Sequence, residues 1–174
     1  MGQFSTCAVL VAMALQAPAP AGTPDFTGVW VADAARSTHS KVLKPSTTGA
    51  PEAPPAPGQA ISRAPTMRIA QKDLSVTLEL LDDQSAPIST LKLTVDGQEN
   101  VNTRAGGALS QVSTTRWDRA ALVTTWRLNR DDQTVLRGVD RWELSENRET
   151  LTVSSQLEDS TSRTESQTVY TRKP

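Results

Sequence analysis

The chain has 174 residues, with 18 Lys and Arg against 19 Asp and Glu, so its formal net charge at pH 7 is −1. This balance excludes a partner held by a basic field, so neither nucleic acid nor an anionic membrane surface is expected. The chain has one His and one Cys, so we expect no disulfide, no transition-metal site and no cofactor.

The first segment is apolar. Residues 1–21 contain no charged side chain, and the run from Cys7 to Leu15 is too short to span a bilayer as a helix. Small residues around Pro18 and Pro20 offer cleavage sites. We therefore expect 1–21 to be a signal peptide, and the protein to be exported to the periplasm or the extracellular space. Residues 22–174 would form a single domain without a transmembrane segment.

The rest of the chain has the patterns of strands and turns. A first strand is expected at 25–33, with its end between Asp33 and Ser37. A Pro-rich segment at 40–65 is expected to be a mobile loop. Alternating apolar residues, such as Leu74, Val76 and Leu78, then indicate half-buried strands. Asp96-Gly97 is a hairpin-turn signal. Further strands are expected at 67–71, 74–80, 91–95, 98–104, 109–117, 122–128, 135–144, 151–157 and 167–172. Eight to ten short strands joined by polar turns favour an all-β sandwich or antiparallel barrel.

The turn at 118–121 allows a register to be predicted for the second half. It pairs Trp117 with Leu122, and the following turns pair Leu122 with Trp142 and Trp142 with Val153. One face then carries nearly all large apolar residues: Trp117, Leu122, Trp126, Leu128, Leu136, Trp142, Leu144, Leu151, Val153 and Leu157.

The same register places Asp140 on the inner face, beside Thr124 and Ser155. One interpretation is a polar anchor in a cavity lined by Trp126 and Trp142. The alternative is a structural carboxylate satisfied by neighbouring hydroxyls or by Arg172, and a register slip of one residue would expose it.

The opposite face is expected to carry Arg116, Arg127, Arg137 and Arg141. Such a row could bind an anionic partner, or it could be a solvated face balanced by Asp and Glu.

The two ends of this β-rich chain resemble the calycin superfamily, which includes the lipocalins, the fatty-acid-binding proteins and avidin. Gly28-x-Trp30 lies on the first strand, and the chain closes on Val169-Tyr170-Thr171-Arg172-Lys173. The resemblance implies a lipocalin-like barrel or strongly curled sheet of 8–10 strands. Gly28, Trp30 and Arg172 would then close one end, with Arg172 packed on the Trp30 ring.

The resemblance also concerns the last strand. In the fatty-acid-binding proteins an Arg and a Tyr two apart reach a carboxylate, and here Tyr170 and Arg172 stand in the reverse order. Together with the segment at 32–37 and the Pro-rich gap, the two ends of the chain are similar to those of a group of uncharacterised exported bacterial lipocalin-like proteins. This resemblance implies no particular function.

No catalytic constellation is present in the sequence. His39 has no partner fixed by spacing, and no nucleophile motif occurs, so we expect a protein that is not an enzyme. The leading hypothesis is an exported barrel that binds a small hydrophobic or amphiphilic ligand, lined by Trp126, Trp142, Asp140, Tyr170 and Arg172. The alternative is an envelope interaction or scaffold protein with a filled core and no ligand.

Overall fold

The computed structural model describes residues 23–43, 66–103, 109–130 and 133–174. The expected signal peptide and most of the Pro-rich segment lie outside these residues. Within them the structure is all-β, as predicted, and nothing described has the length and hydrophobicity of a membrane-spanning helix. The strands are Gly28–Leu43 (β1), Thr66–Lys72 (β2), Ser75–Leu81 (β3), Pro87–Thr94 (β4), Asp96–Thr103 (β5), Ser110–Asp118 (β6), Ala121–Arg130 (β7), Gln133–Leu144 (β8), Thr150–Glu158 (β9) and Ser162–Arg172 (β10).

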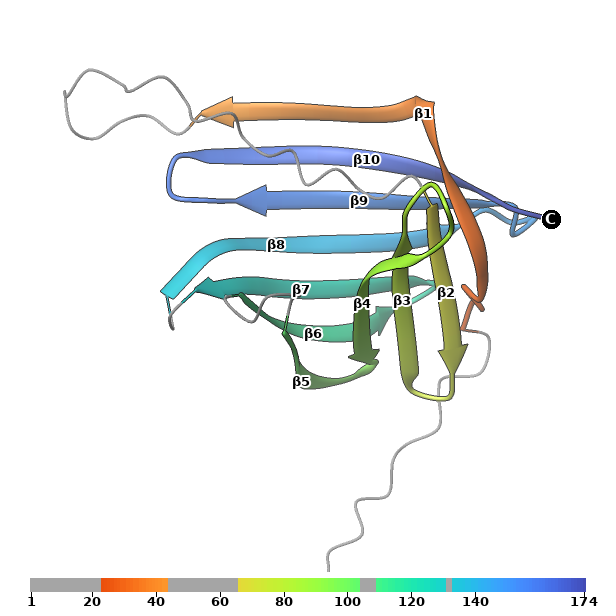
Figure 1. The fold of residues 1–174 in the computed structure, drawn as a ribbon, viewed down its shortest axis with the longest axis horizontal. Helices are drawn as coiled ribbons and strands as arrows, with labels where there is room; N and C mark the ends of the chain where they lie inside the picture. The colour runs from red at the N-terminus through yellow and green to blue at the C-terminus, as the bar shows by residue number, and fades with distance from the viewer. Residues whose placement is uncertain (1–22, 44–65, 104–108, 131–132) are drawn as a thin grey trace, which may run out of the picture.

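The strands form one sheet in the order β4-β3-β2-β1-β10-β9-β8-β7-β6-β5. Strands adjacent in sequence are neighbours in the sheet, except β4 and β5, which form its two edges, and the pairing of β1 with β10 joins the two ends of the chain. Figure 1 shows β6 to β10 and the second half of β1 as one layer, with β2, β3 and β4 crossing in front of it. The sheet therefore curls on itself into a nearly closed antiparallel barrel.

A bulge in β1 allows this strand to belong to both layers. Its first half pairs with β2 and with the end of β10, and its register with β10 shifts between Asp33 and Thr38. The Asp33 carboxylate accepts hydrogen bonds from the backbone N–H groups of Ala35 (3.0 Å) and Arg36 (3.2 Å). Ser37 Oγ donates to Asp33 O at 2.7 Å and accepts from Val169 N at 3.1 Å.

The predicted end of the first strand near Ser37 is therefore wrong. The polar residues that interrupt the apolar alternation form the bulge, and the strand then continues along β10 to Leu43. A bulge bends a strand without ending its pairing, and this bend turns β1 from the direction of β2 to that of β10 (Figure 1).

The two edges of the sheet meet at β4 and β5 through side chains. Asn102 Oδ1 accepts from Lys92 N at 2.8 Å, and its Nδ2 donates to Lys92 O at 3.0 Å. Asn100 Oδ1 accepts from Thr94 N at 3.1 Å. The hairpin turn predicted at Asp96-Gly97 is therefore wrong: both residues belong to β5, and β4 and β5 share no backbone ladder. The two edges bond through asparagine side chains instead.

The register predicted for the second half is confirmed. Trp117 pairs with Leu122, Leu122 with Trp142, and Trp142 with Val153. Most of the predicted inner-face residues are buried: Leu122, Trp126, Leu128, Trp142, Leu151 and Val153. Since side chains alternate between the faces of a strand, this register also fixes which polar groups lie inside.

The hydrophobic core lies where the two layers cross. It joins Trp30 and Met67 to Trp142, Leu151 and Tyr170. Trp30 is completely buried, its Nε1 donates to Phe26 O at 2.9 Å, and the Arg172 guanidinium carbon lies 4.5 Å from its ring centroid. The contact predicted between Arg172 and Trp30 is therefore present.

Gly28 is part of the same closed end of the barrel. Its φ of +152° and the approach of Arg172 Nη1 to 3.1 Å from where a Cβ would stand leave little room for a side chain. Arg172 Nη1 also donates to Thr27 O at 2.8 Å, next to this glycine.

Candidate functional site

A row of polar side chains crosses the inner face of the long strands. Thr115 of β6 pairs with Thr124 of β7, then with Asp140 of β8, Ser155 of β9 and Ser166 of β10. We call these five residues the inner polar layer. Thr115, Thr124 and Ser155 are at most 4% exposed, so the layer is part of the interior.

Asp140 is held at two points within this layer. Trp126 Nε1 donates to its Oδ2 at 2.9 Å, and the Ser155 hydroxyl donates to its Oδ1. Beside it, the hydroxyls of Thr115 and Thr124 are 3.1 Å apart and hydrogen-bonded. Asp140 thus lies inside beside Thr124 and Ser155, as predicted, and neighbouring side chains satisfy part of its hydrogen-bonding capacity.

The Trp126 ring reaches Asp140 by lying over Gly138 of β8, its cross-strand partner. A Cβ at position 138 would stand 2.7 Å from Gln156 O and 2.8 Å from Trp126 Cζ2. Real Cβ atoms do not approach other atoms so closely, and the backbone oxygen cannot move out of a ladder. Glycine at this position therefore allows the indole to donate to the carboxylate.

Three buried polar atoms next to the layer have no hydrogen-bond partner among the described residues: Ser113 Oγ, Trp117 Nε1 and Trp142 Nε1. Trp117 and Trp142 stand in the row on the core side of the layer, and Ser113 stands in the row on its other side. Ser113 is 2% and Trp142 is 8% exposed. Buried polar groups are usually satisfied by protein, ordered water or a ligand, so a water or a ligand oxygen is the expected partner at these atoms.

The predicted ligand-lining residues divide into two groups. Trp126, Asp140 and Trp142 lie in three neighbouring rows of β7 and β8. Arg172 is six residues beyond Ser166 on β10, a separation of about 20 Å along a strand, and is bonded at the Trp30 end.

The prediction that Arg172 shares a site with Asp140 is therefore corrected, as is its role as a partner of that carboxylate. Tyr170 lies in the hydrophobic core at 2% exposure. Sequence reasoning missed Ser113, Thr115 and Trp117 as site residues, although the register predicted for β6 and β7 places Thr115 in the layer and Ser113 and Trp117 in the rows beside it.

Several described carboxyl groups have a displaced pKa. Hydrogen bonding to Arg141 lowers the pKa of Asp118, and hydrogen bonding to Thr27 lowers that of Asp25. Every described carboxyl group whose pKa departs clearly from its usual value has it lowered. The opposed shifts typical of an acid and base pair do not occur among them.

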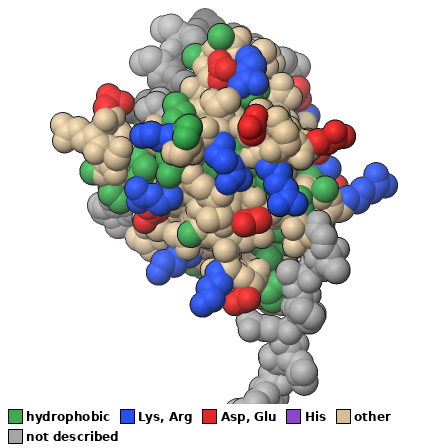
Figure 2. Space-filling model, turned by 90° about the vertical axis from the view of Figure 1, so that its right-hand side faces the viewer, with side chains coloured by type: hydrophobic (Ala, Val, Ile, Leu, Met, Phe, Trp, Pro, Cys, Tyr) green, Lys and Arg blue, Asp and Glu red, His purple; other side chains and the backbone are tan. Residues whose placement is uncertain are grey.

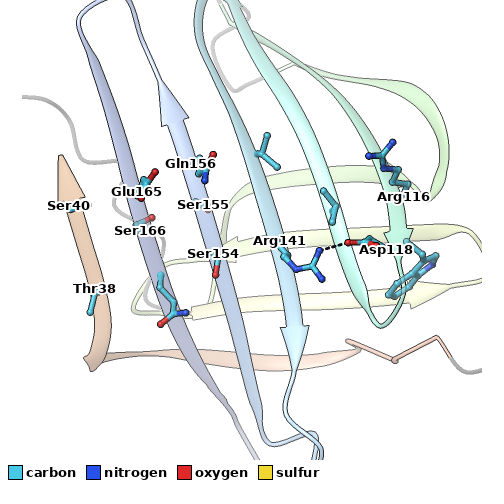
Figure 3. A pocket seen from close by; sticks show the side chains of 14 residues that line it. Thr38, Ser40, Arg116, Asp118, Arg141, Ser154, Ser155, Gln156, Glu165 and Ser166 are labelled. Atoms are coloured by element: carbon cyan, nitrogen blue, oxygen red, sulfur yellow. Dashed lines mark hydrogen bonds and ion pairs between the residues drawn. The ribbon is translucent and has the colours of Figure 1, made fainter. Parts of the chain in front are cut away.

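The outer face of the same strands has a hollow of about 830 Å³, which we call the outer trench (Figure 3). Arg141 lies in its middle and forms an ion pair with Asp118 at 2.6 Å. The lining residues are Thr38 and Ser40 (β1), Glu165, Ser166 and Gln167 (β10), Ser154, Ser155 and Gln156 (β9), Val139 and Arg141 (β8), Val123 (β7), and Arg116, Trp117 and Asp118 (β6).

The outer-face arginines are mostly balanced by acids. Arg127 pairs with Glu99 at 3.0 Å, and Arg137 pairs with Glu158 at 3.0 Å. Figure 2, which shows the end of the molecule with the C-terminus, has basic and acidic side chains scattered among uncharged ones. The pairing favours a solvated, balanced face over a site for an anionic partner.

No protein-family model matches the chain, and no curated protein matches it. Among solved structures, the chain is similar to the zebrafish ileal bile acid-binding protein in complex with cholic acid. The two share 14% sequence identity over 85% of this chain and 98% of that one, with a TM-score of 0.49. A likeness at this level identifies neither a family nor a ligand for this chain.

Proposed function

We propose that the protein is an exported, non-enzymatic, lipocalin-like barrel that binds one small amphiphilic molecule at the inner polar layer. The observation that carries the proposal is the group of partnerless donors beside the layer, Ser113 Oγ, Trp117 Nε1 and Trp142 Nε1. Each buried donor without a partner costs about 1–3 kcal/mol. A molecule with acceptor oxygens would remove that cost when it binds.

The surroundings of the layer fit an amphiphile. The polar row of Thr115, Thr124 and Ser155 lies between a row with Trp142 and a row with Trp126. A ligand whose oxygens meet the indole N–H groups could therefore lay its carbon skeleton along the two aromatic rings. Apolar walls with a few fixed polar groups are the usual composition of a small-ligand site.

Export and kinship rest on the sequence. The uncharged leader with its small-residue cleavage sites supports export. The Gly28-x-Trp30 opening and the packing of Arg172 on Trp30 support a lipocalin-like barrel.

Calorimetric titration of the purified chain with monolaurin tests the proposal. Monolaurin has an uncharged head rich in oxygens, and laurate serves as the charged comparator. We expect saturable binding of monolaurin with one site, and a two- to tenfold weaker affinity in Trp142→Phe, which keeps the ring but loses the donor. Thr90→Ala, on the outside of β4, is the control. Absence of binding by both lipids, or unchanged affinity in Trp142→Phe, contradicts the proposal.

The second candidate is an interaction protein with a filled core. It is favoured by the dense packing around Trp30 and Tyr170 and by the position of the large hollow on the outer face. Ligand-free behaviour in the titration, together with binding at the outer trench, would support this candidate.

A further inference from the structure

The outer trench is built by the register of the long strands. Its main row runs Arg116, Val123, Arg141, Ser154, Gln167 and Thr38, each paired with the next across neighbouring strands. With strands about 4.8 Å apart, six strands give the row a length of about 24 Å. The trench therefore runs across the strands and is elongated, and its volume of about 830 Å³ is on the scale of ligand sites.

Most of the backbone beneath the trench is engaged within the sheet. The strands from β6 to β10 are joined by ladders, so their amides are paired. The second half of β1 is the exception among the described strands, because it pairs with β10 on one side while its pairing with β2 ends at Val31. An extended peptide would add at that edge, whereas recognition over the rest of the trench depends on side chains.

The side chains of the trench are uncharged polar groups or balanced charges. Arg116 and Arg141 contribute +2, and Asp118 and Glu165 contribute −2, so the charges of the lining sum to zero. Arg141 is further neutralised by Glu143 at 3.1 Å. This balance provides no field for a polyanion such as nucleic acid, and it suits a ligand without net charge.

The remaining groups are donors and acceptors around a small apolar floor. Gln156, Gln167 and Ser154 bring amides and a hydroxyl. Gln156 Oε1 accepts from Arg163 Nη2 at 3.0 Å, which orients the amide and leaves its N–H groups to donate. Val139, on β8, lines the trench and is 39% exposed. A ligand with many hydroxyls along its rim and C–H groups on its face matches this distribution.

We propose that the outer trench binds a linear, uncharged oligosaccharide laid across the strands. The amides of Gln156 and Gln167 bond to sugar hydroxyls, and the C–H faces of the sugar rings lie on Val123 and Val139. The trench is long enough for several rings in a line. The main row of the trench lies on the face opposite the inner polar layer, although Trp117, Ser155 and Ser166 also line the trench. Binding in the trench does not depend on a ligand at the layer.

The test is calorimetric titration of the whole chain with cellohexaose, maltohexaose, xylohexaose and chitohexaose, and with the disaccharide of each series. We expect binding of at least one hexasaccharide and much weaker binding of its disaccharide. The double variant Gln156→Ala/Gln167→Ala should lose about five- to 100-fold in affinity, because two hydrogen-bonding amides are removed. Gln98→Ala, an exposed glutamine on β5, should bind as the wild type does.

Three results would overturn the proposal: no binding of any hexasaccharide, binding that the double variant does not change, or binding of an extended polar decapeptide that the double variant abolishes. Unfolding by urea shows whether each variant is folded. Monolaurin binding by the same double variant should match the wild type, so that failure at the trench and failure at the inner layer remain distinguishable.

Discussion

Replacement of Trp30 by Ala tests the closed end of the barrel most severely. The side chain is completely buried, and it stands between Phe26, whose carbonyl it bonds at 2.9 Å, and the Arg172 guanidinium, 4.5 Å from the ring. Removing a buried aromatic side chain costs about 3–5 kcal/mol through lost burial and the cavity that remains. We expect a loss in this range for Trp30→Ala.

Two further variants divide this loss into its parts. Trp30→Phe keeps most of the apolar volume and loses the indole donor, so it should cost about 1–2 kcal/mol. Arg172→Ala removes the cation above the ring and the bonds to Thr27 O and Arg148 O. In a double-mutant cycle with Trp30→Ala, the coupling energy should be about 0.5–2 kcal/mol, the scale of a cation–π contact.

Urea unfolding followed by circular dichroism measures all four free energies, because this signal does not depend on the number of tryptophans. A loss below about 1 kcal/mol in Trp30→Ala would refute the assignment of Trp30 as a core residue that closes the barrel. A coupling energy near zero would refute the contribution of Arg172 to that closure.

Three other changes have defined outcomes. Gly138→Ala should destabilise the protein by about 1–3 kcal/mol through overpacking and should alter Trp126 fluorescence by breaking its bond to Asp140; a neutral effect in urea unfolding would contradict the geometry. Asn102→Ala should cost about 1–2 kcal/mol and speed hydrogen exchange at the Lys92 amide, with Gln98→Ala as control; unchanged exchange would show that the asparagine does not join the edges of β4 and β5. Burial acts to raise the pKa of Asp159, but hydrogen bonds from Thr161 and Ser162 lower it overall. Its stabilising effect should therefore be present above about pH 4 and be lost as the pH falls through the lowered pKa of the folded state, so Asp159→Ala should cost about 1 kcal/mol at pH 7 and less at pH 2.5; an equal cost at both values would contradict this sign.

The register of β6 to β9 could be predicted from the sequence because it has one solution that buries the large residues. The short turn at 118–121 fixes the first pair, and Trp117, Leu122, Trp142 and Val153 then follow on one face. A slip of one residue would expose all of them, so the hydrophobic effect selects the observed pairing. Asp140 is inside for the same reason.

The bulge in β1 and the side-chain contact between the edges of β4 and β5 could not be predicted in this way. The segment after Asp33 has no alternation, because its polar side chains bond to the local backbone and interrupt the ladder. The bonds from Asn100 and Asn102 to β4 depend on the distance between two edges, and no local pattern reports that distance.

The candidate site was partly predictable. Trp126, Asp140 and Trp142 share neighbouring rows, so the alternation that defines the core also brings them together. Arg172 was assigned to the same site through a family resemblance, and the length of β10 keeps it away. The outer trench depends on the curvature of the whole sheet, which the sequence pattern of single strands does not contain.

The central claim is that the indole N–H groups beside the inner polar layer donate to oxygens of a bound ligand. NMR of the tryptophan indole N–H groups tests it most directly. Trp30 and Trp126 donate to Phe26 O and to Asp140, whereas Trp117 and Trp142 have no acceptor among the described residues. Addition of monolaurin should shift the Trp142 and Trp117 signals downfield and leave Trp30 in place. Signals of Trp142 and Trp117 that stay unchanged at saturating monolaurin and laurate would contradict the claim.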